Sequence, residues 1–288
     1  MSSAPSLASA RLLALLWLLA FALVSAGCAE DAPPPRTLEA PPPPVTLDIG
    51  LSSSAGSFAT LVAAPYAEET ERAVLNFVTG NSAVLLDELA AGQFDAVLTQ
   101  HVPAESELWF NPVALDALAI VVHPDNPLRR VSRSQLQAIY SGQIDEWAAV
   151  GSAGGAIVPV GREQGSAARA TFEARIMGER RTTINSLIAT GNQALLQAVA
   201  ADPQAIGYTM LGALDSERDV TAVAVEGTVP SPQSTESQEY LLSAPLYFVT
   251  REEPSGPQAT GAELRAFLAW LQSPAGQEIL SEKYGGVR

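Results

Sequence analysis

Residues 156–177 read AIVPVGREQGSAARATFEARIM, and this stretch joins a strand pattern to a helix pattern. The β-branched, apolar run at 156–161 predicts a strand, and the apolar spacing at 171–177 predicts a helix. Gly165 and Ser166 form the turn between them. Because a helix start leaves backbone N–H groups unpaired and carries partial positive charge, this strand-to-helix turn is suited to holding an oxyanion.

Arg162 precedes the turn at Gly165 and Ser166, and two other turns have the same form. Arg162 offers a planar guanidinium that matches two oxygens of a tetrahedral anion. The stretches GLSSSAGS at 50–57 and VTGNSAV at 78–84 also lead from a strand pattern into a helix pattern through hydroxyl groups. Each turn alone is a weak signal, because many such turns simply cap helices. Because such turns lie together at the carboxyl ends of parallel strands, the three together predict a small-anion site.

Strand and helix patterns alternate along the rest of the chain, which is typical of an α/β fold with largely parallel sheets. Ser132 with Gln135, and Thr260 with Glu263, have the spacing of capping boxes at helix starts. The remaining strands are expected at 45–50, 73–78, 94–99, 115–122, 205–209, 220–225 and 245–250, and helices at 57–69, 81–92, 132–142, 192–202 and twice near the C-terminus.

The N-terminal segment predicts export and a lipid anchor. Arg11 precedes an apolar run at 12–24 that ends in small residues and Cys28. The run is too short for a membrane-spanning helix, so 1–28 is interpreted as a signal peptide with a lipobox and Cys28 as the lipid attachment site. An ordinary signal peptide with an incidental cysteine is the alternative. The proline-rich segment 29–44 is expected to be an extended tether.

Composition restricts the function. The formal net charge of −15 argues against binding nucleic acid, but it does not exclude one small anion held by local dipoles. One cysteine permits no intrachain disulfide, and His101 and His123 are the only histidines. The sequence has no P-loop and no nucleophile elbow, so no enzyme activity, metal or cofactor is expected. His123 is expected to be structural, while His101 follows a strand into the expected crevice and stays a candidate ligand contact.

Several ordered segments resemble a known family. The segments are LDALAIVVHPDNPL, SRSQLQAIYSGQIDEWAAVG, IVPVGREQGSAARATFE, AVAADPQAIGYTMLG and YLLSAPLYFVTREE. They are similar to the phosphate-binding lipoproteins of bacterial ABC-type phosphate transporters, which have the type II periplasmic-binding-protein fold. The resemblance covers most of 45–288 and implies two α/β lobes with mixed, mostly parallel sheets and a hinge. By resemblance, one lobe comprises 45–123 plus 241–288 and the other comprises 124–240, with crossings near Pro124 and Tyr240.

The resemblance also implies the binding residues, with two departures. Ala168 stands where the family has a threonine, so it lacks that hydroxyl. Gln100 stands where some members have an aspartate that accepts the proton of hydrogen phosphate. Because an amide has both a donor and an acceptor, Gln100 is expected to relax selection between phosphate and sulfate, unless it points to solvent. The implied ligand-binding residues are Ser54, Ala55, Ser82, Gln100, Arg162, Gly165, Ser166, Ala167 and Ala168.

Taken as a whole, the sequence predicts an extracytoplasmic, lipid-anchored, monomeric solute-binding protein. It would capture inorganic phosphate or a similar oxyanion and deliver it to the subunits of an ABC permease. Sulfate, molybdate and tungstate are alternative ligands. A ligand-sensing receptor of the same fold, without a transport role, is the alternative from another class, and a lipid-anchored enzyme is disfavoured because the catalytic motifs are missing.

Overall fold

A computed structural model of the chain describes residues 43–152, 154–214, 219–256 and 258–287. The expected lipid attachment at Cys28, the signal peptide and nearly all of the tether lie outside the described residues. Among the residues described, no helix has the length and apolar character needed to cross a membrane.

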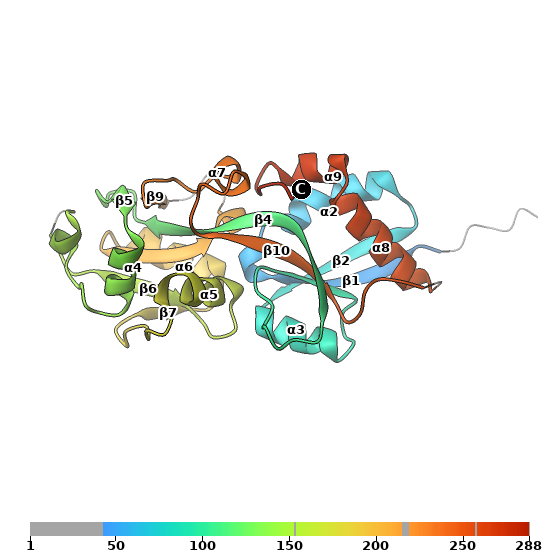
Figure 1. Ribbon diagram of the computed structural model, residues 1–288, viewed down its shortest axis with the longest axis horizontal. Helices are drawn as coiled ribbons and strands as arrows, with labels where there is room; N and C mark the ends of the chain where they lie inside the picture. Colours follow the sequence, from blue (N-terminus) through green and yellow to red (C-terminus); the bar gives the residue numbers. More distant parts are fainter. Residues whose placement is uncertain (1–42, 153, 215–218, 257, 288) are drawn as a thin grey trace, which may run out of the picture. The chain divides into compact units, whose positions relative to one another are not determined.

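The strands form one mixed sheet with the order β2-β1-β3-β10-β4-β8-β6-β7, in which β9 also pairs with β4, and β5 pairs with β9. Pairing is parallel at both ends of this order and antiparallel around the long strands β4 and β10, which run side by side through the middle of Figure 1. The strands are β1 (Val45–Ser52), β2 (Ala73–Gly80), β3 (Ala96–Thr99), β4 (Trp109–Val122), β5 (Arg130–Val131), β6 (Val158–Arg162), β7 (Leu187–Ala189), β8 (Ala205–Met210), β9 (Thr221–Val225) and β10 (Ser243–Thr250).

The helices follow the strands in the alternation that the sequence predicts. The capping box of Ser132 and Gln135 is confirmed at the start of α4. The helical segments are η1 (Ser53–Ala55), α2 (Phe58–Glu69), α3 (Ser82–Ala90), α4 (Arg133–Tyr140), η2 (Trp147–Val150), α5 (Ala167–Phe172), the π-helical η3 (Glu173–Met177), α6 (Asn192–Ala201), η4 (Leu211–Ala213), α7 (Pro232–Glu236), α8 (Ala259–Leu271) and α9 (Pro274–Leu280).

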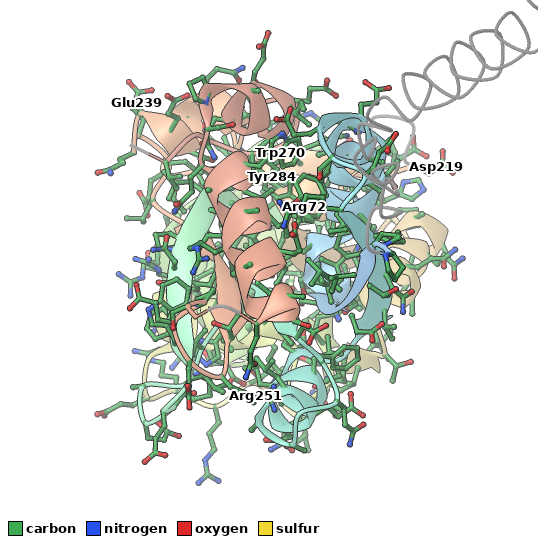
Figure 2. The ribbon with its side chains drawn as sticks, turned by 90° about the vertical axis from the view of Figure 1, so that its right-hand side faces the viewer. Arg72, Asp219, Glu239, Arg251, Trp270 and Tyr284 are labelled. Atoms are coloured by element: carbon green, nitrogen blue, oxygen red, sulfur yellow. The ribbon has the colours of Figure 1, made fainter. Side chains whose placement is uncertain are left out.

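The capping box expected of Thr260 and Glu263 is wrong. Helix α8 begins at Ala259, so Thr260 lies inside the helix, and the capping position Gln258 makes no side-chain cap. The Glu263 carboxylate instead pairs with the Arg72 guanidinium at 3.0 Å. Figure 2 looks onto α8, with Arg72 beside it. The Glu263 side chain therefore makes a tertiary ion pair with Arg72 and does not cap the start of α8.

The two largest hydrophobic cores lie in two different lobes of the described chain. The first lobe packs β1, β3, α2 and α8 around residues such as Phe58 and Phe267. The second lobe packs α4, α5, β8 and β9 around residues such as Trp147 and Phe172. Each fully buried Leu or Phe side chain in such a core contributes roughly 1.5–3 kcal/mol.

Strand β4 belongs to both lobes. Its first part, from Trp109 to Ala117, pairs with β10, and its last part, from Leu118 to Val122, pairs with β8 and β9. The chain therefore passes from one core to the other within a continuous strand. The lobe boundaries expected near Pro124 and Tyr240 stay predictions, and the change of partner in β4 falls at Ala117 and Leu118.

Candidate anion-binding site

The first turn follows β1 and is held by its own hydroxyls. Ser52 lies at the start of η1, and its Oγ accepts a hydrogen bond from the Ser54 N–H at 3.2 Å. Ser54 and Ala55 are fully buried, and Ser54 Oγ has no hydrogen-bond partner among the described residues. The carbonyl of Ala55 accepts a hydrogen bond from the Tyr284 hydroxyl at 3.3 Å. The turn is therefore fixed on both sides while the Ser54 hydroxyl remains available.

The second turn connects the other two. Ser82 is the first residue of α3 and is buried. Its Oγ lies 2.8 Å from Ser52 Oγ in the first turn and accepts a hydrogen bond from the Ala167 N–H of the third turn at 3.2 Å. The three turns that the sequence singles out are thus brought together. In this arrangement the Ser82 hydroxyl and the Ala167 N–H bind each other, so the two groups link the lobes.

The third turn approaches the second very closely, and Gly165 makes this possible. Gly165 has φ +81°, and a Cβ built there would lie 2.4 Å from Asn81 Oδ1 and 2.9 Å from Ala83 Cβ. The Gly165 carbonyl accepts a hydrogen bond from the Ala83 N–H at 3.1 Å. Ser166 is the N-cap of α5, and its Oγ accepts a hydrogen bond from the Arg169 N–H at 3.5 Å. A glycine is required here both for its backbone conformation and for the space.

Ala167 and Ala168 complete the third turn without polar side chains. Both are buried, with exposed fractions of 1% and 0%. Ala168 therefore contributes a backbone N–H in the first turn of α5 and no hydroxyl. The departure from the family threonine removes one polar group from this place.

Arg162 reaches across to the first turn. Its side chain is fully buried, and Nη2 donates to Ser53 Oγ at 2.9 Å. Nε and Nη2 also donate to the Glu163 carboxylate at 2.8 and 3.0 Å. Nη1 has no partner among the described residues. The guanidinium N–H groups expected to bind an anion through two hydrogen bonds are therefore largely occupied by Glu163 and Ser53. Within the described part of the chain, only Nη1 remains available to a ligand.

Glu163 stays ionised beside this arginine. Burial alone raises the pKa of Glu163, but hydrogen bonds from the Arg162 side chain and the Gly191 N–H outweigh burial and hold the pKa below its usual value. The Gly191 N–H lies 3.1 Å from Glu163 Oε2. Because both charges are fixed by several hydrogen bonds, the pair orients the guanidinium instead of leaving it mobile.

Gln100 lies at the end of β3 and is buried, which answers whether it points to solvent. Its Nε2 donates to Asp116 Oδ2 at 2.9 Å, and its Oε1 has no partner among the described residues. Asp116 Oδ1 accepts from the N–H groups of Ala117 at 2.7 Å and Gly212 at 3.0 Å. Burial raises the pKa of Asp116 to about 6, although these hydrogen bonds oppose the rise.

Three unpartnered atoms define what the site offers. They are Ser54 Oγ, Gln100 Oε1 and Arg162 Nη1, and all three residues are at least 96% buried. Ser54 and Arg162 belong to segments joined through Ser53, and β3, which leads to Gln100, pairs with β1, which leads to Ser54. An unpaired buried polar group costs about 1–3 kcal/mol, and such groups are rare. A hydroxyl, an amide oxygen and a guanidinium edge left unpaired in one region point to a small polar anion.

The two histidines lie outside this set. Burial lowers the pKa of His101, with Glu105 opposing, so this imidazole is neutral at neutral pH. His101 bonds to Thr99 through its backbone alone. His123 Nδ1 accepts from the Asp125 N–H at 3.1 Å, as its expected structural role requires. Over the described ranges, no group of three or more His, Cys, Asp or Glu side chains is placed to hold a metal ion.

Sequence reasoning missed three contributors to the site. Asp116, Ser53 and Glu163 each contact a residue of the candidate set. Asp116 carried the clearest signal, because a carboxylate within the apolar strand LDALAIVV must be paired if it is buried. The contacts of Ser53 and Glu163 depend on the direction of the Arg162 side chain, which no local spacing reveals.

Comparison with known proteins places the chain in a family. The chain belongs to the PBP superfamily, whose domain model matches residues 38–275. The phosphate-binding protein PstS of Bacillus subtilis is 25% identical over 248 residues, which cover 84% of this chain and 80% of that protein. PstS of Pseudomonas aeruginosa is 31% identical over 188 residues, which cover 59% of this chain and 57% of that protein.

A solved structure extends this comparison to three dimensions. A phosphate ABC transporter substrate-binding protein from Clostridium perfringens, with bound phosphate, superimposes with a TM-score of 0.77 at 25% identity, covering 84% of this chain and 100% of that chain. The expected two-lobed type II periplasmic-binding-protein fold and the resemblance to phosphate-binding proteins are confirmed.

Proposed function

We propose that this chain captures inorganic phosphate between its two lobes outside the cytoplasm and delivers it to an ABC permease. The observation that carries this proposal is the set of three buried, unpartnered atoms on Ser54, Gln100 and Arg162. They offer a hydroxyl, an acceptor and a charged donor, and hydrogen phosphate has unprotonated oxygens and one O–H to match them. The names of the Bacillus and Pseudomonas relatives support phosphate as the ligand.

The bonds between the lobes support capture by closure. The first and third turns meet through Arg162 and Ser53, and the second and third meet through Ala83 and Gly165. The turns come from opposite lobes, so a rotation at the crossings in β4 and before β10 would separate them. Closing then converts dispersed polar groups into one desolvated shell, in which a hydrogen bond to a charged group contributes about 1.5–3 kcal/mol.

The remaining parts of the proposal concern location and partners. We propose that Cys28 carries the lipid anchor, that 29–44 holds the binding unit away from the membrane, and that the chain acts as a monomer without cofactor or catalysis. The relatives are named as binding proteins, which supports a role without chemistry. Subunits of an ABC permease are the proposed partners, and the similarity to the ABC transporter substrate-binding protein of Clostridium perfringens supports them.

Calorimetry of the purified chain tests the ligand. The protein is first freed of carried-over anion by extensive dialysis, and phosphate, sulfate, molybdate and tungstate are then titrated into it separately. We expect phosphate to bind most tightly. Arg162→Ala is expected to weaken binding by about 1.5–3 kcal/mol, whereas Arg175→Ala, which removes an exposed arginine of the same lobe, leaves it unchanged. If none of the four oxyanions binds the native chain, the proposal is wrong.

A transport role and a sensing role predict different ATP hydrolysis and phosphate uptake by the permease. In membrane vesicles that contain the partner ABC permease, a transport protein stimulates ATP hydrolysis and phosphate uptake when phosphate is added. A receptor that binds phosphate with equal affinity leaves both rates unchanged. We expect stimulation by the native chain and its loss in Arg162→Ala.

A further inference from the structure

The amide of Gln100 has only one orientation that satisfies its neighbour. An ionised carboxylate accepts hydrogen bonds and donates none. Asp116 Oδ2 faces the Gln100 amide at 2.9 Å, so the amide must turn its NH₂ group towards Asp116. Gln100 Oε1 then faces away from Asp116, buried and without a partner among the described residues.

Asp116 is itself held in one orientation. Its Oδ1 accepts from the backbone N–H groups of Ala117 and Gly212, at 2.7 and 3.0 Å. The carbonyl of Gly212 accepts a hydrogen bond from the Ser57 hydroxyl, at the end of the first turn. The backbone therefore fixes the carboxylate, the carboxylate fixes the amide, and the chain of contacts ends beside the turn that carries Ser54.

We propose that Asp116 is a positioning residue that makes Gln100 an acceptor only, so that the site selects a protonated oxyanion, hydrogen phosphate, over fully ionised sulfate. The proposal rests on the proposed function of the site. The hydroxyl of hydrogen phosphate donates to Gln100 Oε1. Sulfate has no proton to donate at neutral pH, so its oxygen would face Oε1 with two sets of lone pairs opposed and no compensating hydrogen bond.

This inference reverses what the amide alone suggests. A free glutamine side chain can turn either end to a ligand and would accept both anions. Here the donor end is occupied by Asp116, so only the acceptor end remains. A neutral amide oxygen thereby serves as the hydrogen-bond acceptor for the ligand hydroxyl at the position where some members of the family carry an aspartate.

Asp116→Asn tests the proposal because the backbone predicts which way the new amide turns. The Asn oxygen must stay at the position of Oδ1, since only an acceptor satisfies the N–H groups of Ala117 and Gly212. Its NH₂ group then faces Gln100, which turns over and presents its own NH₂ group to the ligand. We expect the ratio of phosphate to sulfate affinity to fall by about 10-fold to 100-fold.

A double variant separates orientation from charge. Asp116→Asn combined with Gln100→Glu has the same total charge as the native chain and moves the carboxylate from one residue to the other. One Glu oxygen accepts from the Asn NH₂ group and the other faces the ligand as an acceptor, so the native preference for phosphate should return. Asp145→Asn, which neutralises an exposed carboxylate of the second lobe, is the charge control and should leave the ratio unchanged.

Phosphate and sulfate are titrated by calorimetry into each full-length protein, with circular dichroism to confirm folding. The proposal is overturned if folded Asp116→Asn keeps the native ratio, or if the double variant fails to restore it. Should Asp116→Asn not fold, Gln100→Leu removes the acceptor directly, and an unchanged ratio in that variant also overturns the proposal. Binding of neither anion to the native chain would instead contradict the proposed function itself.

Discussion

Gly165→Ala is a direct test of closure, because the change acts on a contact between the lobes. A Cβ at this position would lie 2.4 Å from Asn81 Oδ1 and 2.9 Å from Ala83 Cβ. Asn81 cannot simply turn away, since its Oδ1 accepts from the Ala83 N–H at 3.1 Å and its Nδ2 donates to the Gln164 carbonyl at 2.9 Å. The two turns must therefore separate by about 0.5–1 Å, which stretches the hydrogen bonds between them beyond their normal length.

The expected magnitude follows from those bonds. The Ala83 N–H to Gly165 carbonyl bond and the Asn81 to Gln164 bond each contribute about 0.5–1.5 kcal/mol, so their loss weakens ligand binding by about 1–3 kcal/mol in total. Positive φ adds about 1–2 kcal/mol of strain in an alanine, whether the lobes are closed or open. Gly151→Ala measures that strain alone, because Gly151 has φ +75° and nothing within 4 Å of its Cβ position.

The assay compares two quantities in both variants. Calorimetry gives phosphate affinity, and urea unfolding of the anion-free protein gives the free energy of unfolding. We expect Gly165→Ala to bind phosphate about 5-fold to 150-fold more weakly than Gly151→Ala, with a similar free energy of unfolding. Equal phosphate affinities in the two variants would refute the reasoning that the turns meet in the bound state.

Three further predictions follow from the site and its surroundings. Ser82→Ala removes the hydroxyl that joins Ser52 to the Ala167 N–H, and we expect phosphate affinity to fall by about 0.5–1.5 kcal/mol in calorimetry, with Ser134→Ala, an exposed hydroxyl, as the control. Cys28→Ser is expected to release the chain from membranes into the soluble fraction with unchanged phosphate affinity; retention in the membrane fraction would contradict a lipid anchor. The pKa of Asp116 is raised from 3.8 to about 6 by burial, so the native state holds the proton more tightly and stability falls as pH rises through this window. The native chain should therefore lose up to about 3 kcal/mol more unfolding free energy between pH 4 and 6 than Asp116→Asn; parallel urea-unfolding profiles for the two proteins would contradict this.

The three turns were predictable because their signals are local. Hydroxyl and glycine residues at 50–57, 78–84 and 162–168 mark helix starts. Parallel pairing of β1 with β2 and β3 brings the turns at 50–57 and 78–84 to the same edge of the sheet. The structure agrees that Ser52, Asn81 and Ser166 cap the following helical segments. Capping and convergence, which the sequence left as alternatives for each turn, both occur.

The partners of the buried side chains could not be predicted in the same way. Ser52 meets Ser82 across 30 residues, and Arg162 meets Ser53 across 109. Such contacts depend on the direction of each side chain and on the approach of two lobes. Neither of these produces a periodic pattern of residues in the sequence. Glu263 shows the opposite error, because its spacing indicated a helix cap while a distant arginine determined its position.

Charge also explains why the orientation of one amide can decide the ligand. The chain carries a formal net charge of −15, and the Arg162 guanidinium is already paired with Glu163. Surface carboxylates act weakly at the site, since salt at physiological strength screens exposed charges beyond about 8 Å. Buried dipoles at hydrogen-bond distance are screened far less, and they act more strongly than they would in water. Discrimination between two anions of similar size and charge must then come from the match of donors to acceptors, and Gln100, oriented by Asp116, is where a proton on the ligand makes the difference.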